Sequence, residues 1–193
     1  MAEVPSTFQL SLGSAAPDFT LPDPAGNEVS LQQARGDRGT VVIFACNHCP
    51  FVVHLAEAIG EAADEWRDRG VRTVVISSND VDNYPQDSPE KMARFASANS
   101  WSMPYLYDES QQVAKAYGAA CTPDFFLFDA DLKLVYAGQF DDSRPGNDKP
   151  VTGASLRAAV NALLQGGDPV QPQLPSSGCN IKWKPGNAPA YFG

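Results

Sequence analysis

Two cysteines separated by two residues, Cys46 and Cys49 in the stretch FACNHCPF, are the side chains of this sequence best suited to chemistry. Such a pair can contribute to a metal site, close a structural disulfide or pass electrons as a dithiol. A structural zinc site needs four ligands, and the sequence has only two histidines and no second pair of this kind, so metal binding is disfavoured. Four cysteines in 193 residues are too few for a disulfide scaffold, which favours redox chemistry.

The dithiol lies where a strand is expected to meet a helix. The apolar run 40–45 predicts a strand covered on both faces, and from Pro50 onward apolar residues recur at spacings of three and four until about Gly70. A helix N-terminus stabilises a thiolate, and a protonated His48 would add to this effect. We therefore expect Cys46 to be the more exposed and more acidic thiol, with a pKa below ~8.5. The alternative, a solvated His48 with no effect on Cys46, stays open.

Strands and helices alternate along the rest of the chain and predict an α/β fold with a mixed central sheet flanked by helices. Hydrophobic periodicity and turn residues predict a β-hairpin at 16–32, strands at 71–77, 124–129 and 132–138, and helices at 88–99, 108–118 and 152–166. Residues 1–167 are expected to form one domain that includes the hairpin. Residues 168–193 contain five prolines and are expected to be an irregular extension that packs on this domain.

The net charge excludes some classes of partner. A formal charge of −9 and a pI near 4.5 would repel phosphate backbones and anionic lipids, so neither nucleic acid nor a membrane is an expected partner. The first residues do not show the basic flank and apolar core of a signal peptide, and no apolar run approaches a membrane span. We expect a cytoplasmic protein.

Four stretches of the sequence resemble the thioredoxin-like superfamily, in the peroxiredoxin-like branch of alkyl hydroperoxide reductase and thiol-specific antioxidant proteins. They are APDFTLPDPAGNEVSL, FACNHCPF, YGAACTPDFFLFD and SGCNIKWK. This resemblance spans nearly the whole chain and implies a thioredoxin-like fold. It also implies that Cys46 is the nucleophile and Cys49 the resolving thiol. Thr122 and Pro123, joined by a cis peptide bond, would form the backbone wall against which a substrate strand pairs.

The sequence departs from that superfamily in ways that bear on its chemistry. Peroxiredoxins carry a proline and a hydroxyl residue before the nucleophile, and alignment on Cys46 places Gly39 and Ile43 there. We therefore expect peroxide reduction to be slow. The buried acid of thioredoxins is replaced by Thr40, so another group or water would accept the proton. Strongly oxidising relatives also carry a histidine at the position of His48, which predicts a reduction potential above ~−270 mV.

Taken together, these features predict a thiol–disulfide oxidoreductase that uses Cys46 and Cys49 on disulfides of proteins or small molecules. It would need no cofactor, and a reductant such as a thioredoxin or glutathione system would regenerate it. Two alternatives stay open: a non-catalytic protein whose binding surface responds to oxidation of the same pair, and a weak thiol-dependent peroxidase.

The two remaining cysteines form a second candidate pair. Cys121 lies two residues before Pro123, while Cys179, Ile181 and Trp183 alternate in the C-terminal extension and would share one face of an extended segment. We expect this face to pack on the domain and to bring Cys179 close to Cys121, where the two could trade electrons with the first pair. The alternative is that both thiols are separately buried and inert.

Overall fold

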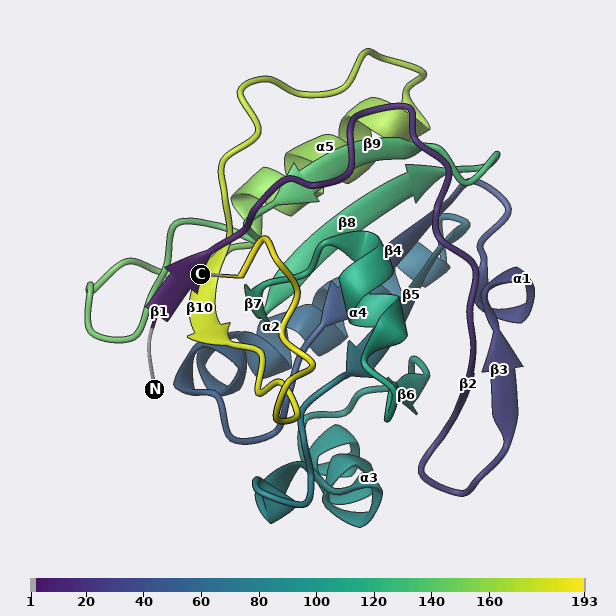
Figure 1. The fold of residues 1–193 in the computed structure, drawn as a ribbon. Helices are drawn as coiled ribbons and strands as arrows, with labels where there is room; N and C mark the ends of the chain where they lie inside the picture. Colours follow the sequence, from purple (N-terminus) through teal and green to yellow (C-terminus); the bar gives the residue numbers. More distant parts are fainter. Residues whose placement is uncertain (1–2, 193) are drawn as a thin grey trace.

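The structure of the protein is a computed structural model that describes residues 3–192 (Figure 1). A five-stranded mixed sheet, in the order β6-β5-β4-β8-β9, forms its centre. β4 (Gly39–Phe44), β5 (Val71–Ser77) and β6 (Tyr105–Tyr107) are parallel, whereas β8 (Asp124–Asp129) pairs antiparallel with both β4 and β9 (Leu134–Gly138). The predicted α/β fold with a mixed central sheet is confirmed.

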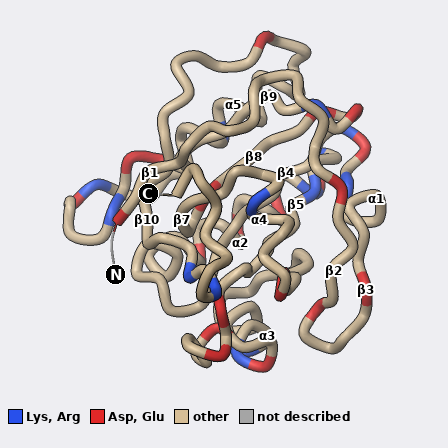
Figure 2. Tube along the Cα trace, viewed as in Figure 1, with Lys and Arg blue, Asp and Glu red and all other residues tan. Residues whose placement is uncertain are grey.

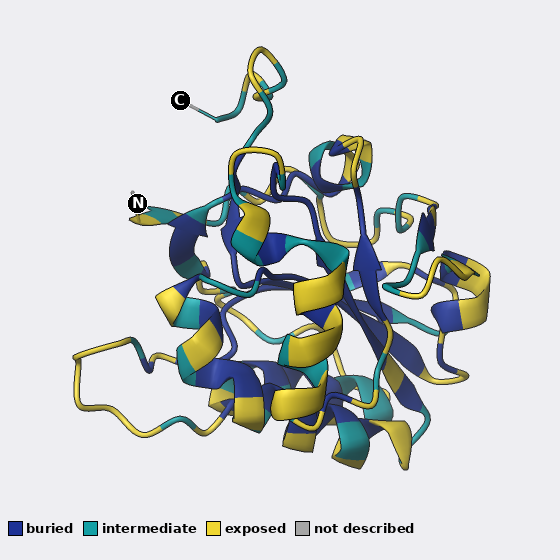
Figure 3. Ribbon diagram, turned by 90° about the horizontal axis from the view of Figure 1, so that it is seen from below, coloured by how far each residue is buried: buried dark blue, intermediate teal, exposed yellow. Residues whose placement is uncertain are grey.

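Helices cover both faces of this sheet. α2 (Pro50–Arg67), α3 (Pro89–Ala98) and α5 (Ala154–Leu164) pack on the face that carries Val41 and Ile43 of β4. α1 (Leu31–Ala34) and α4 (Gln112–Tyr117) pack on the opposite face. Because successive side chains of a strand point to opposite faces, the fully buried β4 supplies both hydrophobic clusters. Figure 3 shows buried strands between helices whose outer faces are exposed.

Local sequence signals set the boundaries of these elements. Pro50 occupies the first turn of α2, and Cys49 is its N-cap residue. Cys46 therefore lies in the loop between β4 and α2, not at the start of the helix as the sequence suggested. The predicted hairpin consists of β2 (Thr20–Pro22) and β3 (Glu28–Ser30), and a capping box between Ser30 and Gln33 starts α1 directly after it.

The C-terminal extension contains a strand that the sequence did not predict. β10 (Ser177–Asn180) is the middle strand of a second sheet, between β1 (Glu3–Pro5) and β7 (Cys121–Thr122) (Figure 1). The prolines made regular structure unlikely in this region. However, the residues between Pro175 and Pro185 include no proline, and this segment is long enough for β10. The prediction that Cys179 and Ile181 share one face is wrong, because they join hydrophobic clusters on opposite faces of the central sheet.

Charged residues are spread over the molecule. Lys and Arg lie among Asp and Glu along the chain trace in Figure 2, without a basic stripe of the kind that follows a phosphate backbone in the part of the chain described. Within residues 3–192, no helix combines the length and the apolar character needed to cross a membrane.

Candidate active site

The two cysteines of the FACNHCPF stretch are buried between the end of β4 and the start of α2. Cys46 is 1% exposed and Cys49 is 0% exposed, and both thiols are free. They belong to the hydrophobic cluster on the α2 face of the central sheet. Cys46, predicted to be the more exposed thiol, is thus buried almost as completely as Cys49, because the loop that carries it is covered by neighbouring chain.

Thr122 contacts both sulfurs of the dithiol. Its hydroxyl lies 3.5 Å from Sγ of Cys46, and its carbonyl oxygen accepts a hydrogen bond of 3.0 Å from Sγ of Cys49. The peptide bond between Thr122 and Pro123 is cis, as the resemblance implied. β7 ends at Thr122, and so the last residue of this short strand positions both a hydroxyl and a carbonyl group at the dithiol.

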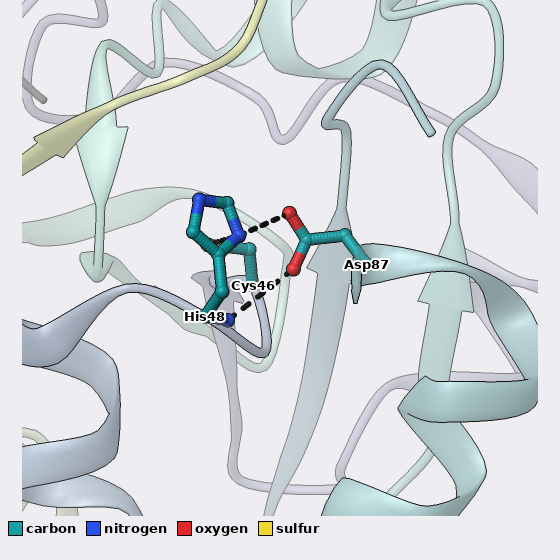
Figure 4. Close-up of side chains that lie close together, drawn as sticks. All are labelled: Cys46, His48 and Asp87. Carbon is teal, nitrogen blue, oxygen red and sulfur yellow. Dashed lines mark hydrogen bonds and ion pairs between the residues drawn. The ribbon is translucent and has the colours of Figure 1, made fainter. Parts of the chain in front are cut away.

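A histidine and a carboxylate flank the other side of Cys46 (Figure 4). Nδ1 of His48 lies 4.0 Å from Sγ of Cys46 and 2.6 Å from Oδ2 of Asp87. His48 is not solvated as the alternative supposed, because its ring contacts Asp87 and stacks on Tyr84, while its effect on Cys46 stays a prediction. Since Cys46 and Asp87 face the same ring nitrogen, His48 does not bridge them as the base of a catalytic triad would.

Asp87 is the centre of a buried hydrogen-bond network. Its Oδ1 accepts the backbone N–H groups of Asn47 and His48, at 2.9 and 3.3 Å. Its Oδ2 accepts a hydrogen bond of 2.8 Å from the side chain of Asn79, whose oxygen in turn accepts the backbone N–H of Lys182 in the C-terminal extension. The loop between the cysteines is thus tied to the extension through one carboxylate.

The two thiols titrate as a pair with widely separated pKa values. The hydrogen bond between their sulfurs lowers the pKa of Cys49 to about 5. The same hydrogen bond, burial and the negative charge of Asp87 raise the pKa of Cys46. Because the two sulfurs share the proton, and Cys49 donates to the carbonyl oxygen of Thr122, the prediction that Cys46 is the more acidic thiol stays a prediction. At neutral pH the pair shares one proton and carries one negative charge.

Three side chains of the site are close enough to share a cation. Sγ of Cys46, Nδ1 of His48 and a carboxylate oxygen of Asp87 lie within 4.8 Å of one another. However, His48 and Asp87 are 2.6 Å apart, which is a hydrogen-bond distance. Zinc bound to both would separate these atoms to roughly 3.3 Å, given metal–ligand distances of about 2.0 Å. The arrangement is therefore that of a histidine hydrogen-bonded to a carboxylate beside a thiol.

The structure does not bring the side chains of the second candidate pair together. In the pairing of β7 with β10, Cys179 lies opposite Thr122, and Asn180 lies opposite Cys121. Because side chains alternate between the two faces of a strand, Cys179 lies on the face of Thr122 and Cys121 on the other face. Cys121 is fully buried, and its sulfur contacts the carbonyl oxygen of Pro123 at 3.6 Å.

Sequence reasoning missed Asp87 and Asn79, which lie between the predicted strand 71–77 and the predicted helix 88–99. Nothing in their spacing relative to Cys46 singles them out, because the loop returns to the dithiol only through the parallel pairing of β4 and β5. The short 3-10 helix Pro85–Asp87 then places the carboxylate at the loop between the cysteines. An aspartate next to a Ser-Pro helix start was the one local signal, and it is weak.

Known proteins resemble this chain in sequence. The profile of the AhpC/TSA family matches residues 12–137. Peroxiredoxin Bcp of Escherichia coli (strain K12) is 30% identical over 154 residues, which cover 74% of this chain and 92% of that protein. The thiol-disulfide oxidoreductase ResA of Bacillus thuringiensis subsp. konkukian (strain 97-27) is 21% identical over 127 residues, 66% of this chain and 69% of that protein.

A solved structure resembles almost the entire chain, including the C-terminal extension. It is that of an uncharacterized conserved protein from Geobacillus kaustophilus, with 52% sequence identity and a TM-score of 0.93 over 96% of this chain and 98% of that chain. The similarity therefore extends well beyond the residues that the family profile covers.

Proposed function

Because the chain belongs to the AhpC/TSA family, we propose that it is a thiol–disulfide oxidoreductase in which Cys46 and Cys49 alternate between dithiol and disulfide. One observation carries the proposal: the two thiols lie together where β4 meets α2, with the Thr122 hydroxyl 3.5 Å from Sγ of Cys46 and the Thr122 carbonyl oxygen 3.0 Å from Sγ of Cys49. A sulfur pair that holds a negative charge at neutral pH contains the thiolate that disulfide exchange requires.

Proton transfer within the pair would prepare Cys46 for attack. When the shared proton lies on Cys49, that thiol donates to the carbonyl oxygen of Thr122, and the Thr122 hydroxyl can donate to the Cys46 thiolate. Cys46 attacks one sulfur of a substrate disulfide, and the other leaves as a thiolate. Cys49 then attacks Sγ of Cys46, its proton passes to the departing substrate sulfur, and a Cys46–Cys49 disulfide remains.

The burial of the dithiol bears on how a substrate reaches it. Thiol or disulfide substrates and a reductant fit the relatives' names. Since Cys46 is only 1% exposed, its covering residues must move before a disulfide of either kind, protein or small molecule, can reach it. A thioredoxin or glutathione system remains the proposed reductant, and the cytoplasm, where both operate, the proposed location.

Insulin reduction driven by dithiothreitol tests this proposal. The wild-type protein should accelerate the reaction, while Cys46→Ser and Cys49→Ser should fall to the rate of dithiothreitol alone, because each variant lacks one sulfur of the disulfide cycle. Cys121→Ser is the matched control and should keep the wild-type rate, since its sulfur faces away from the dithiol. Oxidation of one equivalent of protein without any turnover would contradict the proposal and favour the redox-responsive binding protein.

A peroxidase is the second candidate, and the name of the E. coli relative favours it. Among residues 3–192, the side chains within hydrogen-bond reach of Cys46 are those of His48, Cys49 and Thr122, and none of them carries the cationic guanidinium that polarises a peroxide in peroxiredoxins. We therefore expect hydrogen peroxide to be reduced about 10-fold more slowly than a small disulfide such as hydroxyethyl disulfide. Comparison of kcat/KM for the two substrates would check this, and a higher value for peroxide would make the protein a peroxidase.

A further inference from the structure

A third cysteine faces the dithiol from the C-terminal extension. β10 pairs antiparallel with β7 so that Cys179 lies directly opposite Thr122. Facing residues of adjacent antiparallel strands have Cα atoms about 4.5–5.5 Å apart and side chains on the same face. Thr122 contacts Sγ of both Cys46 and Cys49, and its hydroxyl also approaches the carbonyl oxygen of Cys179 at 3.4 Å. One threonine therefore adjoins all three cysteines.

Cys179 also lies close to Cys49, because β10 packs against α2, whose N-cap residue is Cys49. All three cysteines lie in the hydrophobic cluster on the α2 face of the central sheet. A hydrogen bond between Cys179 and Cys49 contributes to the lowered pKa of Cys49. Burial, with this hydrogen bond and the charge of Cys49, raises the pKa of Cys179 to about 12. Cys179 is thus kept protonated beside Cys49, whose sulfur attacks Cys46 to form the first disulfide.

The chain around Cys179 is fixed on both sides. The hydroxyl of Ser176 donates to the carbonyl oxygen of Pro123 at 2.8 Å, and the backbone N–H of Lys182 donates to Asn79 at 2.8 Å. A Cβ atom on Gly178 would lie 2.0 Å from the carbonyl oxygen of Thr122, so only glycine permits this close approach of β10. The position of Cys179 therefore results from several independent contacts, and not from a loosely packed tail.

We propose that Cys179 is a third redox-active thiol, which exchanges with the oxidised dithiol to form a Cys49–Cys179 disulfide. This step rests on the proposed function, since its precursor is the Cys46–Cys49 disulfide. Sγ of Cys179 attacks Sγ of Cys49, the bond between Cys46 and Cys49 breaks, and the proton of Cys179 passes to Cys46. No electron enters or leaves, so one disulfide replaces another.

The exchange would give the oxidised protein a function that a dithiol alone lacks. It returns Cys46 to the thiol state beside His48 and Thr122 while the oxidising equivalent is stored between α2 and the C-terminal extension. It also ties β10 covalently to Cys49, so oxidation locks the strand that lies along Thr122. Cys121 cannot take this role, because its side chain lies on the opposite face of β7.

Oxidation of the Cys46→Ala variant with diamide, a two-electron thiol oxidant, isolates the new bond. Free thiols are counted after an acid quench and denaturation, and the linked peptides are identified by mass spectrometry. Of the three thiols left in this variant, we expect two to be lost and only Cys121 to remain free. Cys46→Ala/Cys179→Ala should lose none, whereas Cys46→Ala/Cys121→Ala, the matched control, should still lose both of its thiols.

Retention of all three thiols by Cys46→Ala, or a disulfide that includes Cys121, would overturn the inference. In the oxidised wild-type protein, a fraction of Cys46 should be found as a free thiol. If no Cys46 is found as a free thiol after oxidation, this also counts against the exchange. The proposed function fails separately. If the wild-type protein does not turn over insulin but Cys46→Ala forms a Cys49–Cys179 disulfide, the proposed oxidoreductase activity is wrong. The proposed redox activity of Cys179 then still stands.

Discussion

Replacement of Asp87 by alanine should destabilise the protein by about 3–5 kcal/mol, the usual cost of removing one member of a buried ion pair. The Asp87 side chain is fully buried, and its two oxygens accept four hydrogen bonds, from two backbone N–H groups, Asn79 and His48. The variant leaves all of these donors without their acceptor. Since they belong to the loop between the cysteines and to the tie with the C-terminal extension, the loss should also loosen the site.

The same substitution should raise the reduction potential of the dithiol. The negative charge of Asp87 contributes to the raised pKa of Cys46, so its removal favours the thiolate and with it the reduced state. We expect an upward shift of about 30 mV or more, which corresponds to a tenfold change in the equilibrium constant of a two-electron couple. Asp87→Asn keeps the shape of the side chain and should show the shift in potential with a smaller loss of stability.

Urea unfolding and redox equilibration with glutathione measure the two effects. Asp82→Ala is the matched control, because Asp82 lies in the same loop but is exposed. Wild-type stability in Asp87→Ala would show that the network around Asp87 contributes nothing to the fold. An unchanged or lowered potential in both Asp87 variants would show that its charge does not act on Cys46.

His48 cannot be assessed apart from this carboxylate. A potential above ~−270 mV was predicted because strongly oxidising relatives carry a histidine at the position of His48. That value stays a prediction. In the structure, however, Nδ1 of His48 lies 2.6 Å from Asp87 and 4.0 Å from Cys46, so the ring interacts more closely with the carboxylate than with the thiol. The effect of His48 on the thiol should become visible only when Asp87 is replaced.

Local periodicity was sufficient to predict the central elements of the fold. Two apolar runs predicted β4 and β5, and apolar residues at spacings of three and four predicted α2. These patterns could be found locally, because the type of secondary structure alone decides which residues of a buried element are apolar. The three-residue β6 lies at the edge of the sheet and is too short to show a period. The strands β1 and β10 are also too short to show a period, and they exist because β10 pairs with both β1 and β7.

The site was predicted only as far as its residues are neighbours in sequence. The spacing of Cys46 and Cys49 identified the dithiol, and the superfamily resemblance added Thr122 and Pro123. Asp87 and the approach of Cys179 to Cys49 depend on long-range pairing that no local pattern contains. The surroundings of the thiols were missed for a related reason: the helix terminus could be inferred from Pro50, but the burial of Cys46 and the neighbouring carboxylate of Asp87 could not.

The second large effect concerns Asp124, the first residue of β8. Its side chain is 1% exposed, Oδ1 accepts a hydrogen bond of 2.8 Å from Ser6, and Oδ2 has no hydrogen-bond partner within the described residues. Burial raises the pKa of Asp124 to about 7, from 3.8. Below pH 3.8 the carboxyl is protonated in both the folded and the unfolded chain. As the pH rises toward 7, Asp124 ionises freely only in the unfolded chain. The free energy of unfolding therefore falls by about 4 kcal/mol in total.

Asp124→Asn should remove this pH dependence, because an amide of the same shape does not ionise and its oxygen can still accept from Ser6. Between pH 5 and pH 8, the wild-type protein should lose about 2–3 kcal/mol of unfolding free energy relative to the variant. The comparison of the two pH profiles cancels the constant cost of burying the amide N–H groups. Urea unfolding at both pH values measures the difference, and Asp131→Asn, a change at an exposed aspartate beyond the end of β8, should leave the wild-type profile unchanged. Parallel profiles for the wild-type protein and Asp124→Asn would mean that Asp124 is ionised throughout this range, with its charge compensated in the folded state.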